Sequence, residues 1–123
     1  MEDYTDKVMQ HFMQPHNVGY IENPDGKGKA GNPRCGDVME LYLKIENGVI
    51  VNVKFRTMGC GAAIATSSVL TDLVKGKTID EALKVTNNKI VDELGGLPPN
   101  KIHCSVLADA ALKKAIEDYK SKN

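Results

Sequence analysis

The strongest constraint on the fold is a pair of alternating segments joined by Asn47-Gly48. In the first segment, residues 38–46, apolar side chains occupy every second position from Met39 onward. The second segment has the same period of two, and its expected apolar face consists of Val49, Val51, Val53 and Phe55. Asn-Gly is the preferred pair for a type I′ hairpin turn, because both residues tolerate positive φ. We therefore expect a β-hairpin with one apolar face, which helices must cover.

Helix signals lie on both sides of this hairpin. Apolar spacing and stop residues predict helices over 4–14, 89–94 and 105–119, and another between positions 60 and 76. A capping box that begins at Thr78 predicts a further short helix. Turn residues fill the stretch 16–34, which we interpret as a mobile loop. The expected fold is α+β, a single domain over 1–123 with a small antiparallel sheet of about three strands covered by helices on one face.

Composition excludes several classes of partner. The 123 residues carry 16 basic and 16 acidic side chains, and such a balance argues against nucleic acid or an anionic membrane as a partner. No apolar run is long enough to span a bilayer. The chain shows no secretory signal and has three cysteines, an odd number. We therefore expect a cytoplasmic protein whose cysteines serve thiol or metal chemistry instead of a disulfide framework.

All three cysteines stand at turns or at the start of predicted helices. The motifs are Cys35-Gly36-Asp37, Gly59-Cys60-Gly61 and Pro98-Pro99-Asn100-Lys101-Ile102-His103-Cys104. A helix N-terminus favours thiolate over thiol, so Cys104 is a candidate for a reactive or metal-bound sulfur. The alternative is a small apolar cysteine buried beneath the last helix. His11 and His16 have no such cysteine beside them, and we interpret both as surface residues.

The predicted topology brings these motifs toward one another. An antiparallel hairpin places its two ends side by side, which brings Cys35 near Cys60. Cys104 joins them if the last helix packs on the sheet, and Asp37 and His103 would complete a four-ligand set. Thiolate, imidazole and carboxylate together suit zinc, ferrous iron or an iron–sulfur cluster, and they do not suit calcium or magnesium. Because the separations along the chain are wide, we expect an exchangeable site that the fold assembles.

Taken together, the three motifs resemble those of the IscU/NifU-type iron–sulfur cluster assembly scaffolds. The resemblance extends from Tyr4 and Asn17-Val18-Gly19 to the closing helix, and so covers essentially the whole chain. It implies an IscU/SufE-like fold and a role as an assembly scaffold that is not an enzyme. In this family a cysteine desulfurase supplies sulfur, a [2Fe–2S] cluster forms with iron, and the cluster passes to apo-proteins.

The resemblance also implies roles for individual residues. Cys35, Cys60 and Cys104 match the cluster ligands, and Asp37 and His103 match the two residues that compete as the fourth ligand. Cys104 matches the sulfur acceptor. We expect Lys101 to favour its thiolate by charge, and Tyr4 resembles a tyrosine implicated in dimer contacts and persulfide cleavage. Lys101 as a solvated surface lysine and Tyr4 as a packed N-terminal aromatic are the alternatives.

Three points stay open at the level of sequence. Asn100 replaces a valine of the form that a dedicated Hsp70-type chaperone recognises, so dependence on that chaperone is undecided. Two copies could share one cluster in a homodimer, and zinc could replace the cluster. Two other functions also stay open, a zinc-dependent SufU-like sulfur carrier and a structural metal module that binds partners.

Overall fold

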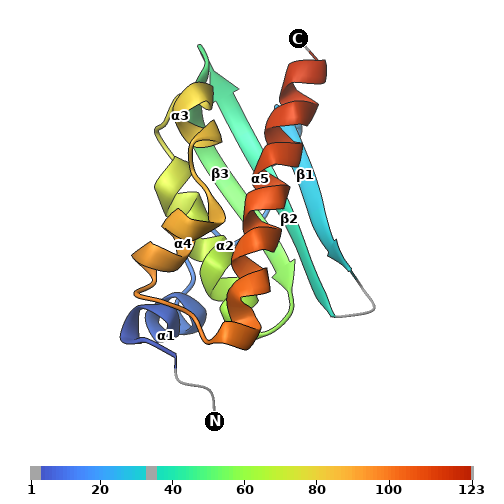
Figure 1. The fold of residues 1–123 in the computed structure, drawn as a ribbon. Helices are drawn as coiled ribbons and strands as arrows, with labels where there is room; N and C mark the ends of the chain where they lie inside the picture. The colour runs from blue at the N-terminus through green and yellow to red at the C-terminus, as the bar shows by residue number, and fades with distance from the viewer. Residues whose placement is uncertain (1–3, 33–35, 123) are drawn as a thin grey trace.

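A computed structural model describes residues 4–32 and 36–122 as one antiparallel sheet with helices packed against one of its faces (Figure 1). The strands are β1 (Gly26–Asn32), β2 (Asp37–Glu46) and β3 (Val49–Met58), in the order β1-β2-β3. The helices are α1 (Asp6–Met13), α2 (Gly61–Val74), α3 (Ile79–Leu83), α4 (Asn87–Glu93) and α5 (Ile102–Ser121), with a 3₁₀ turn η1 (Pro99–Lys101) before α5. The predicted α+β class is confirmed.

The central hairpin forms around Asn47 and Gly48, whose φ angles are 52° and 76°. Its apolar face differs from the prediction at Val51. Lys44 pairs with Asn52 and Ile45 pairs with Ile50, so Val51 is left over as a β-bulge. A bulge shifts the side-chain alternation by one residue. As a result Ile50 is fully buried and Val51 is 40% exposed, the reverse of the prediction.

The interpretation of residues 16–34 as a loop is wrong for its second half, because β1 pairs with β2 from Gly26 to Asn32. This strand lacks an apolar alternation because the backbone of α5 packs directly on it. A Cβ at Gly28 would lie 2.2 Å from the carbonyl oxygen of Ala111, and one at Gly26 would lie 2.4 Å from that of Ala115. Both glycines therefore provide room for the helix.

Helices α2 and α5 cover the sheet, with α5 over β1 and β2 and α2 beside β3 (Figure 1). The covering faces use small side chains, including Ala108, Ala111 and Ala115 on α5, so the layers approach closely. The capping box at Thr78 is present as predicted. Helix α5 begins at Ile102, three residues earlier than expected. Within the described residues, none of the helices combines the length and apolarity that a membrane crossing requires.

Candidate metal centre

Several chain segments meet at one end of the sheet. There β2 begins with Asp37, β3 runs through Gly59 and Cys60 into α2, and α5 begins (Figure 1). Cys60 is the N-cap residue of α2, and Cys104 lies in the first turn of α5. Both sulfurs thus stand at helix N-termini, where the partial positive charge and free N–H groups favour bound anions.

Four of the five predicted ligands form a contiguous group. The Sγ atoms of Cys60 and Cys104 are 3.8 Å apart, and Cys104 Sγ is 3.7 Å from His103 Nε2. His103 Nε2 in turn is 3.2 Å from Asp37 Oδ2. The Cys60 backbone N–H donates to Asp37 Oδ1 at 3.4 Å. Cys35, the fifth predicted ligand, lies outside the described residues.

Two of the four groups differ in their access to solvent. The His103 side chain is 59% exposed, whereas that of Asp37 is only 15% exposed. Gly59 makes room for this covered carboxylate, because a Cβ there would lie 2.3 Å from Asp37 Oδ1. Gly59 thus allows the Asp37 carboxylate to lie close to the backbone next to Cys60.

The surroundings of Cys104 change the pKa of its thiol. Burial raises its pKa to about 12, and the neighbouring Cys60 and Asp37 act in the same direction. In the metal-free protein, desolvation therefore outweighs the helix terminus, which favours the thiolate. The charge of Lys101 lowers this pKa, as the sequence predicts, but it is the smaller effect. A bound metal ion would reverse the balance, since coordination deprotonates a thiol.

Tyr4 also lies beside this site. It packs against the small buried cluster formed by Ala62, Ala63 and Cys104, with Cys60 at its margin. Its placement as an N-terminal aromatic packed on the core agrees with one of the two interpretations from the sequence. A hollow of about 340 Å³ opens between β1 and α5 next to the site, and its lining includes Asp37, His103 and Val106. This hollow adjoins the Asp37 and His103 side of the group.

The donor set determines which ions the site can hold. Two sulfurs, one imidazole and one carboxylate favour zinc, ferrous iron or an iron–sulfur cluster, whereas calcium and magnesium require oxygen ligands throughout. The described residues therefore fit an iron–sulfur cargo.

Comparison with known proteins gives the family. The model of the NifU-like N-terminal domain matches residues 3–123. The chain belongs to the NifU-like N-terminal domain family.

Curated relatives of this NifU-like domain carry descriptive names. It is 56% identical over 120 residues to "Iron-sulfur cluster assembly scaffold protein IscU 1" of Archaeoglobus fulgidus, an alignment that covers 98% of this chain and 78% of the relative. It is 52% identical over 123 residues to "Iron-sulfur cluster assembly scaffold protein IscU" of Escherichia coli K12, covering 97% of this chain and 95% of the relative.

Solved structures share the fold. An iron–sulfur cluster assembly scaffold protein for the SUF system from Fervidobacterium islandicum AW-1 superposes with a TM-score of 0.74 at 26% identity, over 92% of this chain and 96% of that one. An N-terminal NifU-like protein of Brucella abortus gives a TM-score of 0.75 at 20% identity, over 97% of this chain and 95% of that one, which speaks for the fold alone.

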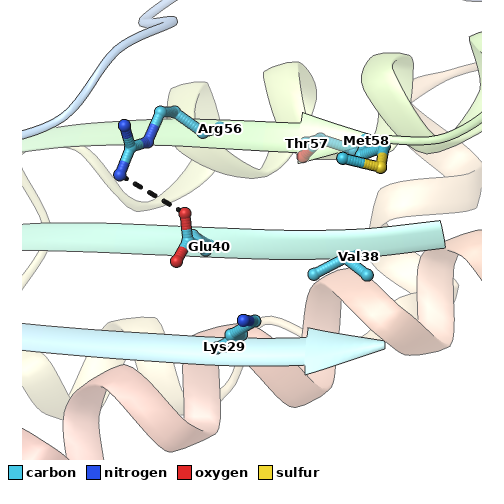
Figure 2. Close-up of a pocket in the computed structure, with 6 residues that line it drawn as sticks. All are labelled: Lys29, Val38, Glu40, Arg56, Thr57 and Met58. Atoms are coloured by element: carbon cyan, nitrogen blue, oxygen red, sulfur yellow. Dashed lines mark ion pairs between the residues drawn. The ribbon is translucent and has the colours of Figure 1, made fainter. Parts of the chain in front are cut away.

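In this NifU-like domain, the face of the sheet that the helices do not cover differs from the metal centre. It holds a pocket of about 560 Å³. Its described lining residues, drawn in Figure 2, are Lys29, Val38, Glu40, Arg56, Thr57 and Met58. Arg56 and Glu40 form an ion pair across it at 3.4 Å. None of these described lining residues is a cysteine or histidine, so this pocket does not belong to the metal centre.

The structure also contains a second group of side chains that can bind a metal ion, which the sequence did not predict. His11, His16 and Asp72 gather between α1 and α2. Asp72 is more than fifty residues from either histidine along the chain, and no local motif links them. Only the packing of α1 on α2 brings the group together.

Proposed function

We propose that this protein is a scaffold on which a [2Fe–2S] cluster is assembled before transfer to apo-proteins. The observation that carries the proposal is the contiguous group of Cys60, Cys104, His103 and Asp37, whose donor atoms suit iron–sulfur cargo. The scaffold names of the relatives support the same function.

In this proposal Cys35, Cys60 and Cys104 hold the cluster, and Asp37 or His103 supplies the fourth ligand. The short distance between His103 Nε2 and Asp37 Oδ2, 3.2 Å, supports an exchange of the fourth position between them. An oxygen ligand binds iron–sulfide more weakly than thiolate does, so coordination by Asp37 keeps the cluster transferable.

A cysteine desulfurase is the proposed sulfur donor, and Cys104 is the proposed acceptor. The Cys104 thiolate attacks the outer sulfur of a persulfide on the desulfurase, the S–S bond breaks, and the desulfurase cysteine leaves as a thiolate. Because Cys104 is fully buried, side chains that pack around it, such as Tyr4 and Leu97, must move before this step. Lys101, at the end of η1, favours the thiolate by its charge.

Anaerobic reconstitution tests the proposal. The protein is mixed with a cysteine desulfurase, cysteine and ferrous iron, and visible absorption is followed before and after addition of an apo-ferredoxin. We expect sulfide-to-iron charge-transfer bands that fade as the ferredoxin acquires its cluster. The variants Cys60→Ser and Cys104→Ser should lose the bands, while Lys29→Ala on the opposite face should retain them.

A colourless protein that keeps zinc and only accelerates the desulfurase would contradict the scaffold and favour a SufU-like sulfur carrier. Zinc without either activity would favour a structural metal module. The cytoplasmic location and a homodimer around the cluster belong to the same proposal, whereas Asn100 leaves dependence on the chaperone open. Cluster content per chain, measured with the molar mass in solution, tests the last of them.

A further inference from the structure

The group formed by His11, His16 and Asp72 lies where the end of α1 packs on the C-terminal half of α2. One ligand atom from each residue lies within 4.8 Å of the other two. The two imidazole rings are 4.9 Å apart between centroids, and His16 Nδ1 is 2.6 Å from Asp72 Oδ2. Three side chains thus direct imidazole nitrogen and carboxylate oxygen into one small volume.

Neighbouring side chains hold the ring of His11, the backbone of His16 and the carboxylate of Asp72. Ser68 Oγ lies 2.7 Å from His11 Nδ1 and also accepts the backbone N–H of His16 at 2.9 Å. The Asn17 amide donates to Asp72 Oδ1 at 3.3 Å and to Thr71 Oγ1 at 2.9 Å. Such outer hydrogen bonds fix ring and carboxylate orientation around metal ions in proteins. The arrangement therefore resembles a built site more than a chance meeting of surface groups.

We propose that His11, His16 and Asp72 form a second metal site, which binds a borderline divalent ion such as ferrous iron or zinc. Two imidazoles and one carboxylate form the ligand set that suits these ions and leaves coordination positions open for water or a further ligand. If His11 Nδ1–H donates to Ser68 Oγ, its Nε2 is the nitrogen that would bind the ion. Oxygen-seeking magnesium and calcium gain little from the two imidazoles.

This second site is separate from the cysteine centre. Cys60 precedes α2 and Asp72 lies near its end, so the helix separates them by ~18 Å at 1.5 Å per residue. The two sites share no residue. Metal at the second site is therefore expected to bind whether or not the cysteines are intact.

A titration of the full chain with zinc tests the proposal. Uniformly ¹⁵N-labelled protein is followed by long-range ¹H–¹⁵N spectra of its histidine rings, in parallel with calorimetry. We expect two equivalents of zinc per chain, with the ring nitrogens of His11 and His16 shifting with one equivalent and His103 with the other. Ring signals of His11 and His16 that stay unchanged at saturating zinc would overturn the proposal.

Variants assign the ligands. His16→Gln and Asp72→Asn should each raise the Kd of one zinc equivalent by more than roughly tenfold and leave the Kd of the other unchanged. Asp92→Asn, at an exposed carboxylate of α4, is the matched control and should change neither. Backbone spectra establish that each variant is folded. If both folded variants still bound two equivalents of zinc with unchanged Kd, the proposed second site would also be contradicted. Cobalt gives an independent readout, because the second equivalent should lack the sulfur-to-cobalt absorption of the first.

Discussion

At the scale of single residues, the two described cysteines of the metal centre differ in reactivity. Cys104 is fully buried with a pKa raised to about 12, whereas Cys60 is half-buried. Because burial raises the pKa of Cys104, its thiolate fraction at neutral pH is lower than that of an ordinary cysteine. We therefore expect iodoacetamide to alkylate Cys60 well before Cys104 in the metal-free protein, as measured by peptide mass spectrometry. Equal rates would show that the start of α5 opens faster than alkylation proceeds.

Asp37 provides a second prediction at this scale. Its carboxylate is covered and lies 3.2 Å from His103, so it is placed to compete for the fourth cluster position. Asp37→Ala removes the hard oxygen ligand, and we expect slower cluster release because iron–sulfide then has only thiolates and imidazole. The rate of transfer to an apo-ferredoxin measures this. Asp92→Asn serves as the control, and transfer by Asp37→Ala at the parent rate or faster would disprove the role.

At the scale of elements, the contact between β1 and α5 depends on glycine. Gly28→Ala places a methyl group 2.2 Å from a helix carbonyl oxygen, so strand and helix must move apart. We expect a loss of about 3 kcal/mol in the free energy of unfolding, measured by urea denaturation. Lys29→Ala, on the exposed side of the same strand, should stay within about 0.5 kcal/mol of the parent. A Gly28→Ala variant as stable as the parent would mean that this packing is loose.

Asp118 joins the same two elements by an electrostatic contact. Its carboxylate accepts the backbone N–H of Lys27 on β1 at 2.9 Å and pairs with Lys122 at 3.0 Å. The Lys122 bond first, and the Lys27 bond second, lower the pKa of Asp118 below its ordinary value of 3.8. As pH falls, Asp118 therefore binds a proton in the unfolded chain before it does so in the native state. The stabilisation of the native state by the Asp118 carboxylate is thus present above pH 3.8 and is lost below it.

We expect Asp118→Asn to be less stable than the parent at pH 7. The difference should be below about 1 kcal/mol, because the pair is partly exposed to solvent. It should shrink as pH falls through the region of carboxylate titration, in urea midpoints taken at each pH. Asp92→Asn controls for the general effect of removing a carboxylate. A difference that stays constant down to the lowest pH would exclude the charge as its cause.

The elements also explain what sequence reasoning could and could not find. The hairpin was predictable because Asn47-Gly48 and a period of two are local signals. Strand β1 was not, since Gly26 and Gly28 bury no side chain and their purpose appears only when α5 packs on them. The bulge at Val51 is likewise invisible in the alternation it interrupts.

The candidate metal centre could likewise be predicted only in part. Hairpin geometry predicted that its ends meet, and the structure places Asp37 beside Cys60. The raised pKa of Cys104 could not be predicted, because it arises from burial beneath elements distant in sequence. His11, His16 and Asp72 carried no signal at all, since only helix packing assembles them.

At the scale of the whole molecule, the cysteine centre brings together three segments that are distant in sequence. The ligands that we propose for it come from the start of β2, the junction of β3 with α2, and the first turn of α5. An ion held by all three binds the native state and not the unfolded chain, so it stabilises the whole fold. At free zinc about a hundredfold above its Kd the gain is about 2.7 kcal/mol.

For a chain of this size we expect that gain to raise Tm by roughly 10 °C in thermal unfolding followed by circular dichroism. A chelator should reverse the rise. Cys60→Ser should lose the part of the rise that comes from the cysteine centre, because one proposed ligand between β3 and α2 is gone, whereas Lys29→Ala on the opposite face should keep the whole rise. An unchanged rise in Cys60→Ser would mean that the stabilising ion sits elsewhere, and the group of His11, His16 and Asp72 would then be the first place to look.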